Sequence, residues 1–125
     1  MFTHKIIQSY YDAAGLASSV TGTYTGQTSK EFDGTVPAST TGFLISLTMA
    51  KTAMQSILIY SSLAVTLKTN SDTSPAQTIN LAAGQQINWG SDFTTPNPIT
   101  ADVTAIYIDN AQTSPTTVKI RVLLT

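Results

Sequence analysis

The chain has 125 residues, no cysteine, one histidine and only 6 basic and 7 acidic side chains, with a formal net charge of −1. This length suits one domain with its own hydrophobic core, and the lack of cysteine excludes disulfides, zinc-thiolate sites and a thiol nucleophile. The basic residues stand singly, so the clustered cations of a nucleic-acid groove are missing, and the near-neutral balance argues against a membrane surface and favours association with other protein.

Neither a signal peptide nor a membrane span is expected. Residues Met1–Ile7 lack a basic region followed by a long apolar one. No apolar run approaches the roughly 18 residues of a membrane helix.

Short segments that alternate apolar with polar residues follow one another along the chain, and Ser and Thr, which suit the solvent side of a strand, make up 35 of the 125 residues. Helices are not expected, and Met49–Gln55 has room for one turn at most. We predict ten strands, at residues 3–11, 19–25, 29–36, 43–50, 55–61, 63–69, 77–81, 85–89, 103–110 and 116–124.

Turn residues separate these segments. Asp33-Gly34 is a typical two-residue hairpin turn, and Ala82–Gly84 is interpreted in the same way. Many short strands with frequent turns indicate a single all-β domain over residues 1–125, an antiparallel β-sandwich of jelly-roll or related Greek-key topology with about eight to ten strands.

Residues 1–18 suggest one subdivision. The small residues of Ala13–Ser18 are interpreted as a flexible linker after the first strand. That strand then either belongs to its own sheet, which we favour, or is an arm that pairs with a neighbouring subunit.

Side chains for chemistry are few. His4 is the sole candidate for a Ser-His-Asp arrangement and lies outside a nucleophile elbow. Glu31 and Asp33 could form a carboxylate pair, but Asp33 suits a turn better. No phosphate-binding glycine loop is present. A cation site would have to draw on four aspartates without calcium-loop spacing: Asp72, Asp92, Asp102 and Asp109. We predict no catalysis and no cofactor.

The aromatic residues are the better candidates for an interface or a ligand contact. Trp89 and Phe93 lie beside a loop stiffened by Pro96 and Pro98, which suits a sugar-stacking platform or an interface anchor. Trp89 could equally cap one end of the core. A second candidate surface near the amino terminus holds Tyr10, Tyr11 and Tyr24.

The second half of the chain resembles a known class of protein. The segments that carry the resemblance are Leu63–Ser71, Pro75–Gly84, Trp89, Val103–Asn110 and Val118–Leu124. In style they are similar to the small β-sandwich structural proteins of tailed bacteriophage particles, of which capsid decoration or cement proteins are the nearest type.

This resemblance implies a non-catalytic virion protein made in the host cytoplasm. It implies a homo-oligomer, with a trimer favoured, that binds the major capsid protein or another virion protein and stabilises the head. Two alternatives stay open: a carbohydrate- or receptor-binding module that uses Trp89, Phe93 and loop tyrosines, and a tail or baseplate accessory protein.

Overall fold

Ten β-strands and one 3₁₀ turn make up the regular structure of the computed structural model, which describes residues 1–125. Each predicted strand is present, and no helix has the length and apolar character to cross a membrane. In chain order the elements are β1 (Phe2–Asp12), β2 (Gly15–Gly26), β3 (Thr28–Val36), β4 (Thr40–Ile45), the 3₁₀ turn Lys51–Ala53, β5 (Met54–Ser61), β6 (Val65–Thr69), β7 (Gln77–Leu81), β8 (Gln86–Gly90), β9 (Ile106–Asn110) and β10 (Thr116–Leu124).

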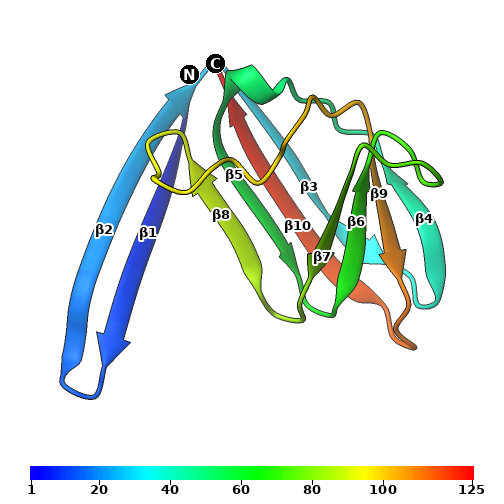
Figure 1. The fold of residues 1–125 in the computed structure, drawn as a ribbon, viewed down its shortest axis with the longest axis horizontal. Coiled ribbons are helices and arrows are strands. Elements are labelled where there is room, and N and C mark those ends of the chain that lie inside the picture. The colour runs from blue at the N-terminus through cyan, green and yellow to red at the C-terminus, as the bar shows by residue number, and fades with distance from the viewer.

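Eight strands form two four-stranded antiparallel sheets that face each other (Figure 1). Sheet I has the order β3-β10-β5-β8, and sheet II has the order β4-β9-β6-β7. Counted from β3, sheet I joins the first, eighth, third and sixth strands, and sheet II joins the second, seventh, fourth and fifth. This is the order of a jelly roll, so the predicted antiparallel β-sandwich is confirmed.

The core lies between the sheets and contains 18 buried apolar side chains. β10 has the predicted alternation, because Val118, Ile120 and Val122 are fully buried whereas Lys119 is exposed. Leu123 is the exception: it is also fully buried but does not belong to the core cluster. A part of the chain outside the two sheets must therefore cover the outer face of sheet I at this end of β10.

The strand expected over residues 43–50 is shorter than predicted. β4 ends at Ile45, and Met49 forms only an isolated bridge to Val103. The apolar alternation nevertheless continues, since Ile45, Leu47 and Met49 are all buried.

β1 and β2 pair only with each other and form a separate two-stranded sheet. We call this hairpin, residues 1–26, the arm. It diverges from the sandwich as it descends in Figure 1, with β1 on the side of the sandwich and β2 outermost. β1 thus pairs within its own chain, as we favoured, but outside both sheets of the sandwich.

The flexible linker predicted at Ala13–Ser18 is wrong. The chain turns at Ala13-Ala14, where the Asp12 carboxylate accepts a hydrogen bond from the Ala14 N–H at 2.8 Å, and β2 begins at Gly15 with a φ of 115°. Small residues suited a linker by composition, yet they continue as a strand because β1 supplies a hydrogen-bonding partner.

The hairpin turn predicted at Asp33-Gly34 is also wrong. Both residues lie inside β3, opposite Lys119 and Val118 of β10. Asp33 pairs with the Arg121 guanidinium at 2.7 Å on the outer face of sheet I, and the lack of a side chain at Gly34 leaves space for the Phe32 ring. These tertiary contacts override the local turn preference.

Ala82–Gly84 is a turn, but it does not join a hairpin. It carries the chain from β7 in sheet II to β8 in sheet I. Gly84 has a φ of 68°, and its N–H donates to the Ser61 carbonyl at 3.0 Å. Glycine suits this left-handed position.

Candidate functional site

The base of the arm is fixed to the outer face of sheet I by Tyr24. This side chain is 5% exposed, and its ring lies so close to Gly90 that any side chain there would overlap it. The Tyr24 hydroxyl donates to the Asp92 carboxylate at 2.5 Å, and its ring meets Phe93 edge-on with centroids 6.5 Å apart. Burial and the Asp92 carboxylate raise the pKa of Tyr24 to about 12. Tyr24 is therefore an anchor and not the exposed contact residue that the sequence suggested.

His4 provides a second anchor at the base. Its two ring nitrogens lie 3.1 Å from the hydroxyls of Ser56 and Ser29, on two strands of sheet I. A catalytic triad requires a carboxylate on one of these nitrogens to stabilise the imidazolium, whereas here both face hydroxyls. Ser56 is 2% exposed. The geometry therefore makes His4 a structural contact.

The arm leaves large apolar side chains in solvent along its length. Of the eight exposed large hydrophobic residues in the chain, seven belong to the arm: Met1, Phe2, Ile7, Tyr10, Tyr11, Leu16 and Val20. These side chains are spread along the arm and do not form one patch, because Phe2 lies opposite Gly26 at the base end whereas Tyr10 and Tyr11 lie near the tip. Their concentration on one hairpin makes the arm the candidate interaction surface of the chain.

Two of the predicted contact residues, Tyr10 and Tyr11, lie near the tip of the arm and are accessible. Tyr10 and Tyr11 are each 68% exposed, and they pair with Ser18 and Leu16 of β2 across a β-bulge. Consecutive residues of a strand point to opposite faces. The arm therefore offers a ring on each of its two faces.

At the end of β8 and in the loop after it, Trp89, Phe93 and Pro98 make contacts within the chain, whereas Pro96 is exposed. The Trp89 indole packs against the core, and its N–H donates to the Thr95 carbonyl at 3.0 Å. Phe93 contacts Tyr24, and the carbonyl of Pro98 accepts from the Gln77 amide at 2.6 Å. Trp89 is thus partly a core residue, and the ring that Phe93 contacts is that of Tyr24.

A cleft of about 500 Å³ separates the arm from sheet I. Residues 3–7 of β1 form one wall, and outward side chains of sheet I form the other, among them Leu58 and Asn88. Arg121 also lines the cleft and pairs with Glu31 at 3.3 Å and with Asp33 at 2.7 Å. Glu31 and Asp33 therefore neutralise a cation and do not form a free carboxylate pair.

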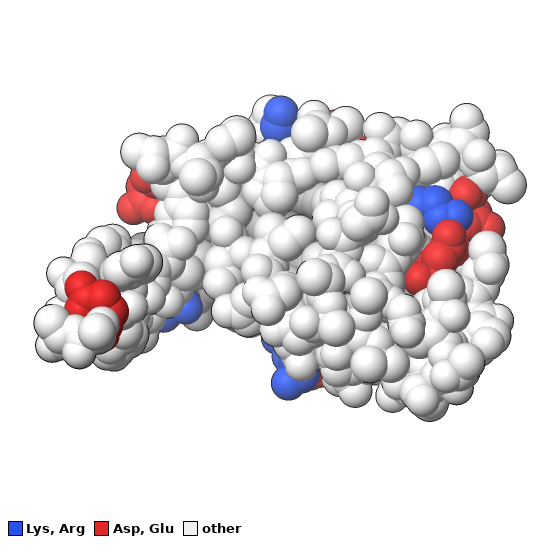
Figure 2. All heavy atoms as spheres, turned by 60° about the horizontal axis from the view of Figure 1, so that its bottom comes forward, with Lys and Arg blue, Asp and Glu red and all other residues white.

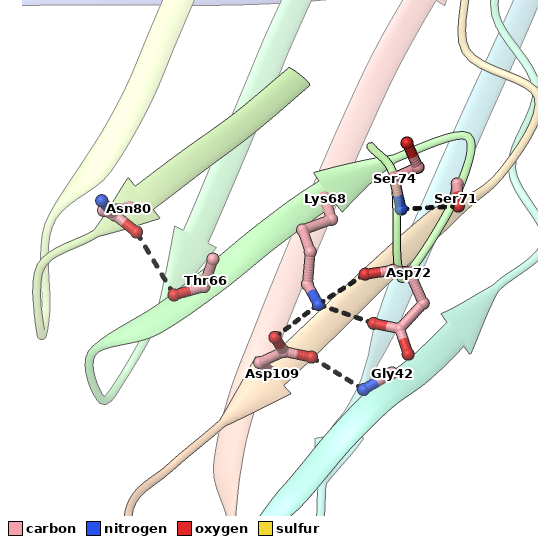
Figure 3. Close-up of polar contacts among 8 residues, drawn as sticks. All are labelled: Gly42, Thr66, Lys68, Ser71, Asp72, Ser74, Asn80 and Asp109. Atoms are coloured by element: carbon pink, nitrogen blue, oxygen red, sulfur yellow. Dashed lines mark hydrogen bonds and ion pairs between the residues drawn. The ribbon is translucent and has the colours of Figure 1, made fainter. Parts of the chain in front are cut away.

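The four aspartates considered for a cation do not meet. Asp92 accepts from Tyr24, and Asp102 accepts from the Lys51 N–H at 2.8 Å. Asp72 and Asp109 do converge, but on Lys68 of β6, whose ammonium lies 2.6 Å and 2.7 Å from their carboxylates (Figure 3). No group of three His, Asp or Glu side chains is placed to hold a metal ion.

Charged side chains occur in small separate groups on the face drawn in Figure 2, most of which is uncharged.

No protein-family model matches the sequence, and no curated protein matches it. A solved structure to which the chain is similar is a solution NMR structure of a de novo designed double-stranded β-helix, with 14% identity, a TM-score of 0.45 and coverage of 74% of this chain and 97% of that one. The jelly-roll assignment rests on the strand order described above.

The His4 anchor predicts weaker folding in mild acid. Burial, and then the positive charge of Arg121, lower the pKa of His4 below its usual 6.5. As the pH falls below 6.5, the unfolded chain takes up a proton that the folded chain refuses, so the free energy of unfolding decreases. We expect His4→Gln, which keeps hydrogen-bonding capacity, to remove this dependence in urea unfolding between about pH 7.5 and 5.5. An unchanged slope in the variant would contradict it.

The Asp109 cluster predicts a second pH effect, in stronger acid. Burial alone would raise the pKa of Asp109, but hydrogen bonds from the Lys68 ammonium and the Gly42 N–H outweigh it, so the pKa is lowered from 3.8. Asp109 therefore stabilises the fold above pH 3.8, and this contribution is lost as the pH falls through its folded pKa. Asp109→Asn should flatten the decline in the free energy of unfolding between about pH 5 and 2.5. A variant that loses stability in acid as steeply as the parent chain would refute the assignment.

Proposed function

We propose that this chain is a non-catalytic structural protein of a tailed bacteriophage particle, a capsid decoration or cement protein that binds the shell as a homo-oligomer. The observation that carries the proposal is the arm, which holds seven of the eight exposed large hydrophobic side chains on a hairpin projecting from a jelly roll. Its partner would be the major capsid protein or another virion protein. The phage setting comes from the resemblance of residues 63–124.

Adhesion of this kind needs only a rigid domain and a projecting segment with exposed apolar side chains. The sandwich is held by 18 buried apolar side chains, and the arm base is held by Tyr24 and His4. Many copies on a symmetric shell then convert modest single contacts into high avidity.

The distribution of ionisable groups favours adhesion over catalysis. The Lys68, Arg121 and Tyr24 side chains are each paired with carboxylates. Catalytic groups need an accessible pocket and a free, poised acid or base.

A carbohydrate- or receptor-binding module is the second candidate, and Tyr10 and Tyr11 favour it. Two rings that are each 68% exposed could stack on sugar faces. Trp89 contributes less to this alternative than the sequence suggested, because its N–H is already bonded to the Thr95 carbonyl. A tail or baseplate accessory protein would use the same arm.

Co-sedimentation with empty phage heads tests the proposal. The intact chain should pellet with heads, and Tyr10→Ser/Tyr11→Ser should pellet far less. The matched control is Tyr107→Ser, which changes a half-buried tyrosine of β9 on the sandwich and should bind as the parent does. Trp89 emission checks that each variant is folded.

The same variants separate the two candidate functions. Chain that stays in the supernatant with heads but binds a glycan through Tyr10 and Tyr11 would overturn the cement proposal in favour of the carbohydrate module. Equal pelleting of all three proteins would overturn the role of the arm.

A further inference from the structure

The outer edge of β2 is an unprotected strand edge. β2 has 12 residues and its sole partner is β1, so its other edge presents unpaired backbone N–H and C=O groups. No backbone hydrogen bond outside the strand pairs involves any residue before Ser39. β1 faces the cleft of sheet I through residues 3–7, whereas no residue of β2 lines that cleft. The loop after β8 approaches β2 over one face of the hairpin, where Val20, Gly22 and Tyr24 line a smaller hollow with residues 92–95.

Proteins normally protect such edges with charge, proline or short length. The other edge strands of this fold are charged or short. β3 carries Lys30, Glu31 and Asp33, and β1 carries Lys5 and Asp12. β4 has 6 residues, and β7 and β8 have 5 residues each. β2, with the sequence GLASSVTGTYTG, has neither a charged residue nor a proline. β2 is therefore the long edge strand that lacks all three of these forms of protection.

We propose that the free edge of β2 pairs antiparallel with β2 of a second copy about a two-fold axis, joining two arms into one four-stranded sheet. The inference rests on the proposed function, whose homo-oligomeric contact it specifies. The faces of the joined sheet, with Tyr10 and Tyr11, stay available to the shell. A two-fold contact gives pairs of copies where the resemblance favoured a trimer.

The composition of β2 fits self-pairing. In a two-fold antiparallel pair, β2 of one copy faces β2 of the other. Charged residues of one sign near the middle of the strand would then face charges of the same sign and repel them. β2 avoids this conflict because it is uncharged. A two-fold axis at Val20 places Ser19 of each copy opposite Thr21 of the other, and such cross-strand pairs are favourable.

Self-pairing also explains how a projecting hairpin can persist. An isolated two-stranded hairpin is marginal in water, whereas three or more strands with an apolar face are stable. β2 from Gly15 to Thr21 is exposed along its whole length. One contact therefore completes the backbone hydrogen bonding of both β2 strands and doubles the width of the sheet.

Charge substitution tests the proposed contact. Ser19 and Thr21 are exposed and lie on one face near the middle of β2. Ser19→Lys/Thr21→Lys should raise the dissociation constant of the pair at least about tenfold, because several like charges would meet. Ser19→Glu/Thr21→Glu should do the same, and an equimolar mixture of the two variants should restore the parent mass by light scattering.

Disulfide trapping maps the same contact in a chain that has no cysteine of its own. Single cysteines at positions 18 to 22 should crosslink most strongly at or next to the axis. The matched control is Ser9→Cys, which lies on β1 opposite Ser19. In the proposed sheet the two Ser9 positions would be about 14 Å apart, three strand spacings, beyond the reach of a disulfide.

The outcomes are distinct. Restored mass in the mixture and crosslinking confined to β2 support the pairing. A parent chain that is monomeric, charged variants that keep the parent mass, or equal crosslinking at Ser9 would overturn it. Paired chain that ignores phage heads would instead refute the cement function and leave the pairing standing.

Discussion

Replacing Ile120 by alanine is expected to lower the free energy of unfolding by about 2–5 kcal/mol. Ile120 is fully buried in β10, one of the two central strands of sheet I, between Phe32 of β3 and Ile59 of β5. These neighbours belong to a hydrogen-bonded sheet and cannot collapse into the space, so a cavity would remain. Total stabilities of domains are about 5–15 kcal/mol, so this change would remove a large part. Urea unfolding followed by Trp89 emission measures it.

Lys119→Ala is the matched control. It changes the adjacent residue of the same strand, which is exposed, so the free energy of unfolding should stay within about 0.5 kcal/mol of the parent. If Ile120→Ala were as mild as Lys119→Ala, Ile120 would not be in the core and the jelly-roll register would be wrong.

Shortening the arm is expected to abolish pairing of the chain and to weaken shell binding by about 10²–10⁴-fold through lost avidity. Replacing residues 8–20 by Asn-Gly would join Ile7 to Thr21, which face each other in the hairpin, through a favourable two-residue turn. The base contacts of His4 and Tyr24 would remain. Exposed tip residues such as Tyr10, Tyr11 and Leu16 would be removed.

The stability of the sandwich should hardly depend on this change. No residue in the replaced segment is buried, so the free energy of unfolding should change by less than about 1 kcal/mol. The measurements are co-sedimentation with heads and urea unfolding. A shortened chain that unfolds would show that the tip is part of the fold, and one that binds heads as well as the parent would contradict the role of the arm.

Strand positions could be predicted from the sequence because the alternation of apolar and polar residues reflects which side chains are buried. Thr116–Leu124 was predicted and observed with the same bounds, and Val118, Ile120 and Val122 face the core as expected. The prediction failed at Asp33-Gly34. The local residues favour a turn, but β10 pairs with this dipeptide and with the β3 residues before and after it. A pattern read locally cannot reveal a partner strand some 85 residues away.

The first residues of β2 were missed for a related reason. Gly15–Ser18 lacks the β-branched residues that favour strands, so composition predicted a linker, whereas pairing with β1 makes it a strand. The anchors were missed because their partners are distant in sequence: Tyr24 with Asp92, and His4 with Ser56. Of the predicted contact residues, Tyr10, Tyr11 and Pro96 are exposed, whereas Trp89, Phe93 and Pro98 are half-buried.

The most direct test of this account is the solution mass of the intact purified chain, measured by size-exclusion chromatography with multi-angle light scattering over a range of concentrations. An adhesive protein whose β2 edges pair should have an even multiple of the 13.2 kDa chain mass. A single-copy mass that persists to the highest concentration would contradict the account, because the arm would then be uncovered in a stable monomer.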